Sequence, residues 1–286
     1  MRETLAEAGA GVRSRSLVRQ PARRRLRGIW LVAASAPLVL LILVPLLALV
    51  FRVSPQDFLA ALADPTVAQA LQLSFVTTLI ATGAGLVFGT PVAYLLARRT
   101  FPGRAALETL LELPMVLPPA VAGIALLVAF GRRGVLGSWL DSIGINIAFT
   151  TIAVVLAQLF VAGPFYVKAA TAAFAGGDRE VEQAAAIDGA GPLSVFRHIT
   201  LPLAASPLMG GAVMMWARAL GEFGATIIFA GNFPGRTQTM PLAIYLGFEL
   251  DLRVSLTLSL ILLFTSAAVL LVVKGVLGRR VSDMIQ

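Results

Sequence analysis

Residues 178–202 read DREVEQAAAIDGAGPLSVFRHITLP, a polar interruption between two strongly apolar runs. Asp178 is a good N-cap and acidic residues follow it, so the pattern predicts a helix of about ten residues. Gly189 and Gly191 predict a sharp bend, and Pro192 suits the first turn of a second short helix. We call this two-helix segment the elbow. Its first helix would offer another protein a smooth face made of Val181, Ala184, Ala185 and Ile187.

The composition indicates a membrane protein. Of the 286 residues, 58% are hydrophobic and 13% are charged, and the mean hydropathy is +0.86. Soluble domains carry roughly 25% charged residues, so these values predict an all-α polytopic membrane protein. The absence of cysteine excludes disulfides and thiolate metal sites. The single histidine, His198, is interpreted as a solvated loop residue, and no metal site is expected.

The apolar runs predict six transmembrane helices. The first follows a basic, poorly ordered tail over residues 1–27. This run is longer than the core of about 7–15 residues in a signal peptide, so we interpret it as a retained span. The polar segments 52–68, 131–146 and 231–249 are expected outside the membrane, the first with a short helix. The predicted spans are residues 28–51, 69–97, 110–130, 147–175, 203–230 and 254–276.

The distribution of positive charge predicts the orientation. Most of the 23 lysine and arginine residues lie in the tail, after the second span, around the elbow and near the C-terminal residues 277–286. Such residues favour the cytoplasmic side, so both termini and the elbow are predicted to be cytoplasmic. Topology also explains the net charge of +8, and the tail lacks interleaved aromatic residues, so no nucleic-acid partner is expected. The outer segments carry only Arg52, Arg132, Arg133, Arg236 and Arg253.

Two charged residues, Arg218 and Glu222, lie within the predicted fifth span, at a spacing that places them on one helix face. Charges at membrane depth are costly and usually face a bundle interior or a wet cavity. The pair either gates a path for a hydrophilic solute or fixes helix packing, and both interpretations stay open. Pro114, Pro118 and Pro119 leave backbone acceptors unpaired, so that end of the third span must pack against protein or line a cavity. The sequence contains no Walker-type loop and no catalytic constellation.

The elbow resembles the EAA loop of ABC importer permeases, a family whose loop docks as a coupling helix in a groove of the ATPase subunit. The resemblance rests on Gln183-Ala-Ala, Gly189 and the closing Ile-Thr-Leu-Pro, with Gln183 where the family usually has Glu. It covers residues 69–276 as the permease domain and implies a type I ABC importer permease fold. The ATPase-coupling residues that it implies are Glu182, Gln183, Ala184, Ala185, Asp188, Gly189, Ile199, Leu201 and Pro202.

Two further stretches, residues 113–123 and 218–245, resemble the oxyanion branch of these permeases, closest to molybdate permeases. That resemblance implies a homodimeric pore in the bacterial cytoplasmic membrane, a cytoplasmic ATPase dimer and an extracytoplasmic oxyanion-binding protein. The chain itself is then expected to be a transport subunit rather than an enzyme, with ATP and magnesium bound by the ATPase and no cofactor of its own. The expected translocation path or gate consists of Arg218, Glu222, Thr226, Pro118 and Pro119.

The sequence leaves other substrates and other classes of membrane protein open. Sulfate/thiosulfate permeases share the residues from Arg218 to Glu222 but usually diverge in the external segment that follows, and tungstate is a further candidate. A carrier driven by an ion gradient would favour inverted repeats and helix breaks at matching positions, and only the prolines of the third span suggest a break. A membrane anchor without transport would not explain the charged pair within the fifth span.

Overall fold

The computed structural model describes residues 21–283 and places the side chains within residues 33–271. All regular structure in this range is helical. Five helices are long and apolar enough to cross a membrane, and six spans result if one bent pair counts as a single span. The predicted all-α multi-span class is therefore confirmed. The chain divides after Phe51 into two compact units, which are described separately.

The first unit contains the helix α1 (Pro21–Arg52) except its last residue, and the apolar part of this helix from Ala33 onward can cross a membrane. This agrees with a first span. The helix begins inside the stretch predicted to be a tail, because Pro21 suits the first helical position and the arginines after it are good helix formers. Residues 1–20 of the predicted tail lie outside the described residues.

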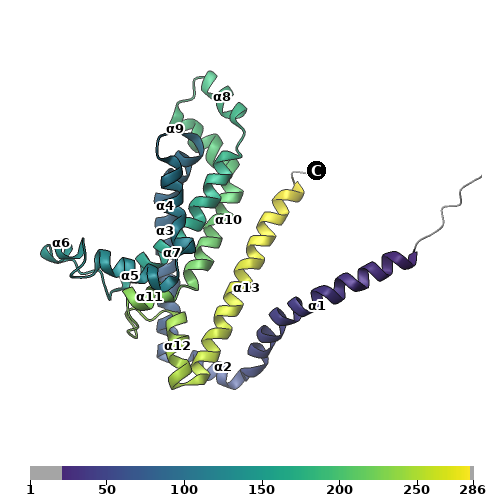
Figure 1. The fold of residues 1–286 in the computed structure, drawn as a ribbon, viewed down its shortest axis with the longest axis vertical. Helices are drawn as coiled ribbons and strands as arrows, with labels where there is room; N and C mark the ends of the chain where they lie inside the picture. The colour runs from purple at the N-terminus through teal and green to yellow at the C-terminus, as the bar shows by residue number, and fades with distance from the viewer. Residues whose placement is uncertain (1–20, 284–286) are drawn as a thin grey trace, which may run out of the picture. The chain divides into compact units, whose positions relative to one another are not determined.

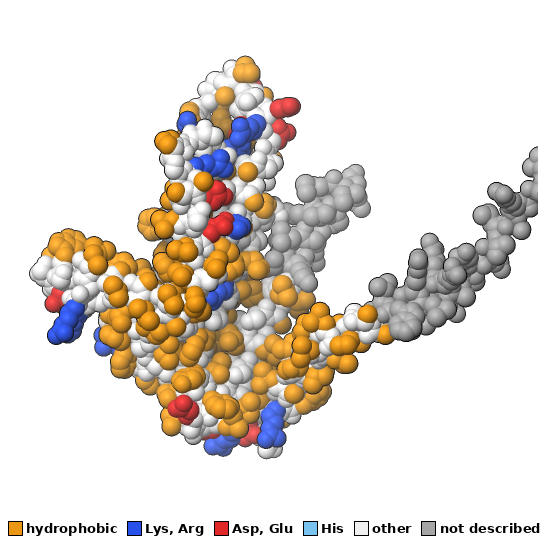
Figure 2. Space-filling view, viewed as in Figure 1, with side chains coloured by type: hydrophobic (Ala, Val, Ile, Leu, Met, Phe, Trp, Pro, Cys, Tyr) orange, Lys and Arg blue, Asp and Glu red, His pale blue; other side chains and the backbone are white. Residues whose placement is uncertain are grey.

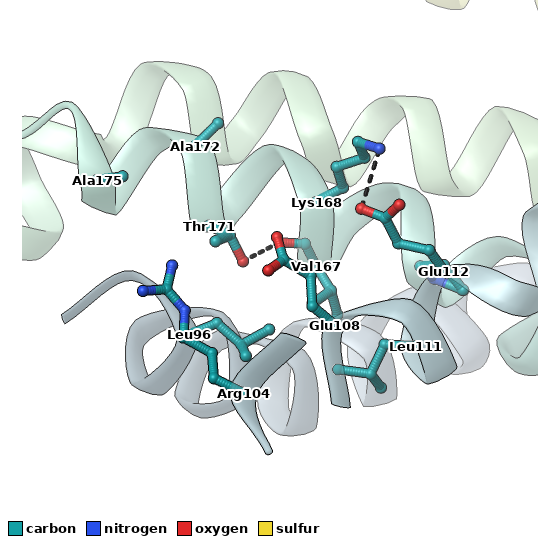
Figure 3. A pocket seen from close by; sticks show the side chains of 11 residues that line it. Leu96, Arg104, Glu108, Leu111, Glu112, Val167, Lys168, Thr171, Ala172 and Ala175 are labelled. Carbon is teal, nitrogen blue, oxygen red and sulfur yellow. Dashed lines mark hydrogen bonds and ion pairs between the residues drawn. The ribbon is translucent and has the colours of Figure 1, made fainter. Parts of the chain in front are cut away.

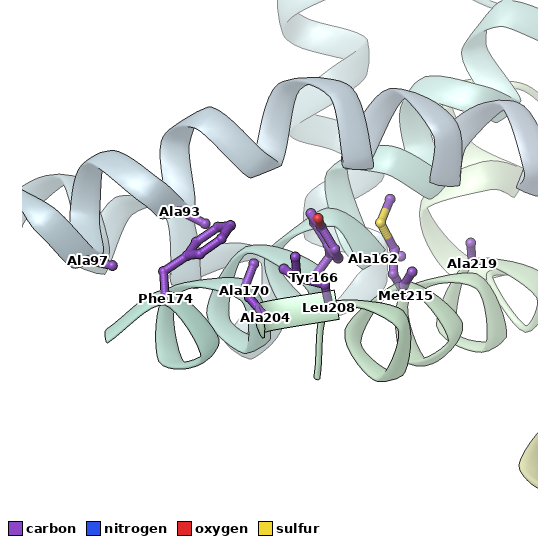
Figure 4. Packing of buried hydrophobic residues seen from close by; sticks show 11 residues of the cluster. Ala93, Ala97, Ala162, Tyr166, Ala170, Phe174, Ala204, Leu208, Met215 and Ala219 are labelled. Atoms are coloured by element: carbon purple, nitrogen blue, oxygen red, sulfur yellow. The ribbon is translucent and has the colours of Figure 1, made fainter. Parts of the chain in front are cut away.

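The core of the second unit consists of the helices α3 (Pro65–Arg98), α7 (Thr151–Ala175) and α10 (Leu201–Leu220), which run side by side in Figure 1. Between them lie alanines and a few large side chains, among them Tyr166 and Met215, which are almost fully buried (Figure 4). Small residues let membrane helices approach closely, and the large ones fill the space that remains. This packing makes the three helices the scaffold that carries the elbow.

Local capping explains where the helices α2 and α3 begin. The carboxylate of Asp64 accepts the N–H of Thr66 at 2.7 Å, so α3 begins at Pro65 rather than at the predicted residue 69. The short helix predicted in this segment is α2 (Pro55–Leu62), which Ser54 caps through its hydroxyl oxygen.

The predicted third span, residues 110–130, is two helices rather than one. The helices α4 (Arg104–Val116) and α5 (Pro119–Phe130) meet at an angle of 117°. Leu117, which precedes Pro118, has an extended backbone with ψ of 137°, as the ring of a following proline requires. The predicted third span is therefore a bent pair of helices, with the bend at the prolines that the sequence singled out.

The predicted fifth span, residues 203–230, is also divided. The helix α10 ends at Leu220, and the short helix α11 (Gly224–Phe229) follows a bend at Gly221. No proline marks this bend. The apolar run predicted one helix, and the break coincides with contacts of Glu222 and Gly224 that are described below.

The segments predicted to lie outside the membrane also contain helix. Residues 231–249, predicted as an external segment, include most of the apolar helix α12 (Met240–Leu250), and residues 131–146 include α6 (Gly137–Ser142). The last span is α13 (Leu252–Asp283), which packs against α12. Between them, the carboxylate of Asp251 accepts the N–H of Arg253 at 2.9 Å, and this bond holds the pKa of Asp251 below its usual value. Figure 2 shows hydrophobic side chains over the middle of this unit and charged ones near the elbow.

Candidate coupling elbow and membrane gate

The first arm of the elbow is the helix α8 (Arg179–Ile187). Asp178 caps it as predicted, since its carboxylate accepts the N–H of Glu180 at 2.9 Å. Gly189 has φ of +91°, a backbone conformation that other residues adopt only with strain, so the predicted need for glycine is confirmed there. Gly191 has φ of −68° and an extended backbone that any residue can adopt, so the prediction fails at this position.

The second arm is the beginning of a membrane span rather than a separate short helix. The helix α9 (Pro192–Val195) begins at Pro192 as predicted. It continues through the π turn η1 (Phe196–Thr200) into α10, so that Pro192–Leu220 is one helical run of 29 residues. A force on the elbow would therefore reach the membrane along a single helix.

The outer face of the elbow is apolar and exposed. The exposed fractions are 45% for Val181, 85% for Ile187 and 78% for Leu193. Figure 1 places α8 and α9 at one end of the bundle, beyond α7 and α10. Large exposed apolar patches can mark contact surfaces for other proteins, so these side chains make the elbow a candidate contact surface. Among the predicted coupling residues, Gln183, Ala184, Asp188, Gly189 and Pro202 are exposed, and Ala185, Ile199 and Leu201 are half-buried.

Glu182, also predicted to be a coupling residue, points away from this face. Its Oε1 atom lies 2.6 Å from Nη2 of Arg98, at the end of α3, and accepts the hydroxyl of Thr200 at 2.8 Å. The side chains of Arg98 and Glu182 are only 8% and 16% exposed. Sequence reasoning missed Arg98, because it is 84 residues from Glu182 and was interpreted only as an indicator of topology.

Arg218 and Glu222 form an ion pair, with 2.8 Å between Nη1 and Oε2. The side chain of Glu222 is 1% exposed and that of Arg218 is 30% exposed. The predicted pairing at this spacing is confirmed, although Glu222 follows the end of α10 and lies in the bend rather than on a continuous helix. Its other oxygen accepts the N–H of Ala225 at 2.9 Å, so Glu222 both pairs with Arg218 and caps α11.

The two divided spans touch at their breaks. A Cβ atom on Gly224, at the start of α11, would lie 2.5 Å from Cβ of Pro119, at the start of α5. Thr226 of α11 is fully buried, and its hydroxyl oxygen has no hydrogen-bond partner. The structure therefore brings together the predicted path residues at Pro118 and Pro119 with those at Glu222 and Thr226. Of the two environments predicted for these prolines, Pro119 therefore has the protein contact, whereas the second break, at Gly221, was not predicted.

The contact between α5 and α11 leads to a prediction about stability. A Cβ atom on Gly123 would lie 2.9 Å from the backbone oxygen of Ala225, which cannot move independently. We expect Gly123→Ala to destabilise the protein by roughly 1–3 kcal/mol. The matched control is Gly83→Ala, because a Cβ atom there meets nothing within 4 Å. Thermal unfolding in detergent should show a lower Tm for the first variant only; equal Tm values would contradict the close packing.

A cavity of about 300 Å³ lies between α4 and α7. Figure 3 shows that its lining includes Lys168, whose Nζ atom lies 2.9 Å from Oε1 of Glu112, and also Arg104 and Glu108. Lys168 and Glu112 are 58% and 38% exposed, so water weakens their attraction. The lining contains two cationic and two anionic side chains. Its net charge is therefore zero and favours neither anions nor cations.

Residues 85–283 match the family model described as the binding-protein-dependent transport system inner membrane component, and the chain belongs to this family. The chain is 41% identical over 242 residues to the molybdenum transport system permease protein ModB of Mycobacterium tuberculosis, a match that covers 85% of this chain and 92% of that protein. It is 48% identical over 178 residues to ModB of Escherichia coli K12, covering 62% and 78% of the two chains. The sulfate transport system permease protein CysW of Escherichia coli K12 is 37% identical over 224 residues, 77% of each chain. The predicted resemblance to oxyanion permeases is thus confirmed.

Solved structures show the same fold. A bacterial ABC transporter that imports alginate has a chain with a TM-score of 0.67 and 16% sequence identity, covering 92% of this chain and 99% of that one. A chain of the MetNI methionine ABC transporter gives a TM-score of 0.56 at 16% identity, covering 74% and 95% of the two chains. The type I ABC importer permease fold is therefore confirmed, while the coupling role of the elbow stays a prediction.

Proposed function

We propose that this chain is the permease subunit of an ATP-driven importer that moves molybdate across the cytoplasmic membrane. The observation that carries the proposal is the similarity to two molybdenum permeases at 41% and 48% identity, against 37% for the sulfate permease. Family membership favours this class over a carrier driven by an ion gradient. It does so although the structure contains a second helix break, at Gly221.

We propose three protein partners: a second copy of the chain, a cytoplasmic ATPase dimer and an extracytoplasmic oxyanion-binding protein. The solved alginate transporter is in complex with a periplasmic protein, which supports the last of these. The exposed side chains of Val181, Ile187 and Leu193 give the ATPase an apolar surface on which to dock. In this arrangement ATP and magnesium are bound by the ATPase subunits, and the elbow and both termini are cytoplasmic.

We propose that the meeting point of α5 and α11 is the gate of the path. Its members are Pro118, Pro119, Arg218, Glu222 and Thr226. The partly exposed guanidinium of Arg218 can attract a dianion, and the buried carboxylate of Glu222 offsets much of that attraction. A gate built in this way needs only to pass a tetrahedral oxyanion, and the binding protein then makes most of the choice between anions.

The proposed function is tested by transport in proteoliposomes that contain the chain, its ATPase and its binding protein. We expect ATP-dependent accumulation of molybdate that exceeds that of sulfate. Faster uptake of sulfate or tungstate would reassign the substrate within the same class. Accumulation that follows an imposed ion gradient and ignores ATP would overturn the class itself.

A further inference from the structure

We propose that Arg98 is a positioning residue that ties the elbow to two membrane helices, so that a movement of α8 is passed to α3 and α10 together. The inference rests on the proposed function, because it concerns how the force of an ATPase reaches the membrane. We call the linkage of Arg98, Glu182 and Thr200 the elbow latch.

The elbow latch joins three elements that are far apart in the sequence. Arg98 is the last residue of α3, Glu182 lies in α8, and Thr200 closes the π turn that leads into α10. One carboxylate oxygen, Oε1 of Glu182, receives both the guanidinium at 2.6 Å and the hydroxyl at 2.8 Å. Removing one partner of an ion pair that is shielded from water is strongly destabilising, because the other charge is left buried and unpaired.

The guanidinium of Arg98 binds Glu182 through only one of its three nitrogens, which is unusual for an ion pair that serves only as a structural support. Only Nη2 is engaged, and both Nε and Nη1 are buried with no hydrogen-bond partner. A support of maximal strength would use two nitrogens in a bidentate pair. A cavity of about 290 Å³ lies beside the latch, lined by Arg98, Glu182, Gly177 and Pro207 among others. The two unused donors belong to the same guanidinium, so Glu182 can move from one nitrogen to another without losing the pair, and the cavity leaves room for that movement.

The end of α7 leaves room for this guanidinium. A Cβ atom on Gly177 would lie 3.1 Å from Nη2 of Arg98, a tight contact that the guanidinium could relieve only by moving a few tenths of an ångström. At the neighbouring Gly176 the nearest atom to a Cβ would be the backbone oxygen of Ala172, at an ordinary 3.5 Å. The glycine at 177 therefore protects the position of Arg98, and the pair of glycines supplies a matched test.

An aromatic cluster beside the latch holds α3 and η1, two of the three latch elements, together with α7 by packing alone. The ring of Tyr94 in α3 lies 5.0 Å from that of Phe196 in η1 and 5.5 Å from that of Phe174 in α7. Because these contacts do not depend on the ion pair, the fold should survive the loss of Arg98. The latch can then be tested for its effect on coupling, separately from folding.

The experiment measures molybdate uptake and ATP hydrolysis in the same proteoliposomes. We expect Arg98→Gln to lower the uptake per ATP hydrolysed by about tenfold or more, with hydrolysis retained. Arg98→Lys should recover part of the ratio, and the exchanged pair of Arg98→Glu with Glu182→Arg should recover more than either single change. Gly177→Ala should lower the ratio and Gly176→Ala should not. Lys168→Gln, in an exposed ion pair that does not involve α8, should leave the ratio unchanged.

A second measurement separates the latch from the function on which it rests. Spin labels at Thr100 and Glu180, both exposed, report the distance between the end of α3 and α8. Arg98→Gln should broaden that distance distribution even if the wild-type importer proves to carry another anion. An unchanged distribution, or an unchanged uptake ratio where the wild type is active, would overturn the latch and leave the proposed function standing. Loss of ATP-driven uptake in the wild type would overturn the proposed function alone.

Discussion

Glu222→Gln is expected to raise ATP hydrolysis in the absence of substrate and to change molybdate uptake. Glutamine keeps an oxygen that can accept the N–H of Ala225, so the cap of α11 survives and mainly the charge is lost. Arg218, 30% exposed, then has no counter-charge at 2.8 Å. Removing one partner of a buried pair costs on the order of 3 kcal/mol, enough to release a gate that this pair holds shut.

The control for this prediction is the exposed ion pair between Arg253 and Asp251. Its atoms are 3.5 Å apart and its side chains are 71% and 43% exposed, so Asp251→Asn should change neither hydrolysis nor uptake. Hydrolysis and uptake are measured in proteoliposomes, and the Tm is measured in detergent. A lower Tm for Glu222→Gln with normal hydrolysis and uptake would show that the pair only fixes packing, the second interpretation left open by the sequence.

The elbow was largely predictable because its determinants are local. Asp178 caps through a neighbouring N–H, and the bend needs glycine at one position, Gly189. Such features depend on residues that are adjacent in the chain, and a sequence motif records them directly. Gly191 shows the limit of this reasoning, since a glycine in a bend does not always adopt a conformation that requires glycine.

Hydropathy did not predict either break, because it measures how apolar a run is and not whether its helix is continuous. At Pro118 and Pro119 the sequence did contain the information, since a residue that precedes proline avoids the helical conformation. At the second break it did not. There the chain turns where Glu222 reaches Arg218 and the N–H of Ala225, and where Gly224 meets α5. These contacts depend on the packing of both helices.

The latch escaped prediction for a related reason. Arg98 was counted among the positive residues that set orientation, and that count contains no information about partners. Its partner Glu182 was assigned with its neighbours to the docking face, although one side of α8 must face the bundle. Only the rotation of α8 about its axis decides which residues turn inward, and that rotation is fixed by contacts with α3 and η1.

Gly189→Asp is expected to abolish ATP-driven uptake while the protein stays in the membrane. The change places a residue with a side chain at φ of +91°, which costs roughly 1–2 kcal/mol, and adds a negative charge next to the apolar docking face. Because a Cβ atom there meets nothing within 4 Å, the rest of the fold should be unaffected. Uptake is measured together with the amount of ATPase that copurifies with the permease.

Two further variants separate strain from charge at this bend. Gly189→Ala adds strain alone, and Gly191→Asp adds the charge where φ is −68° and the backbone accepts any residue. If the geometry of the bend controls docking, Gly189→Ala weakens ATPase binding more than Gly191→Asp does. If the charge controls it, the order is reversed. Full uptake and normal ATPase binding in Gly189→Asp would show that the ATPase does not dock on this bend, because a docked partner could not accommodate both changes.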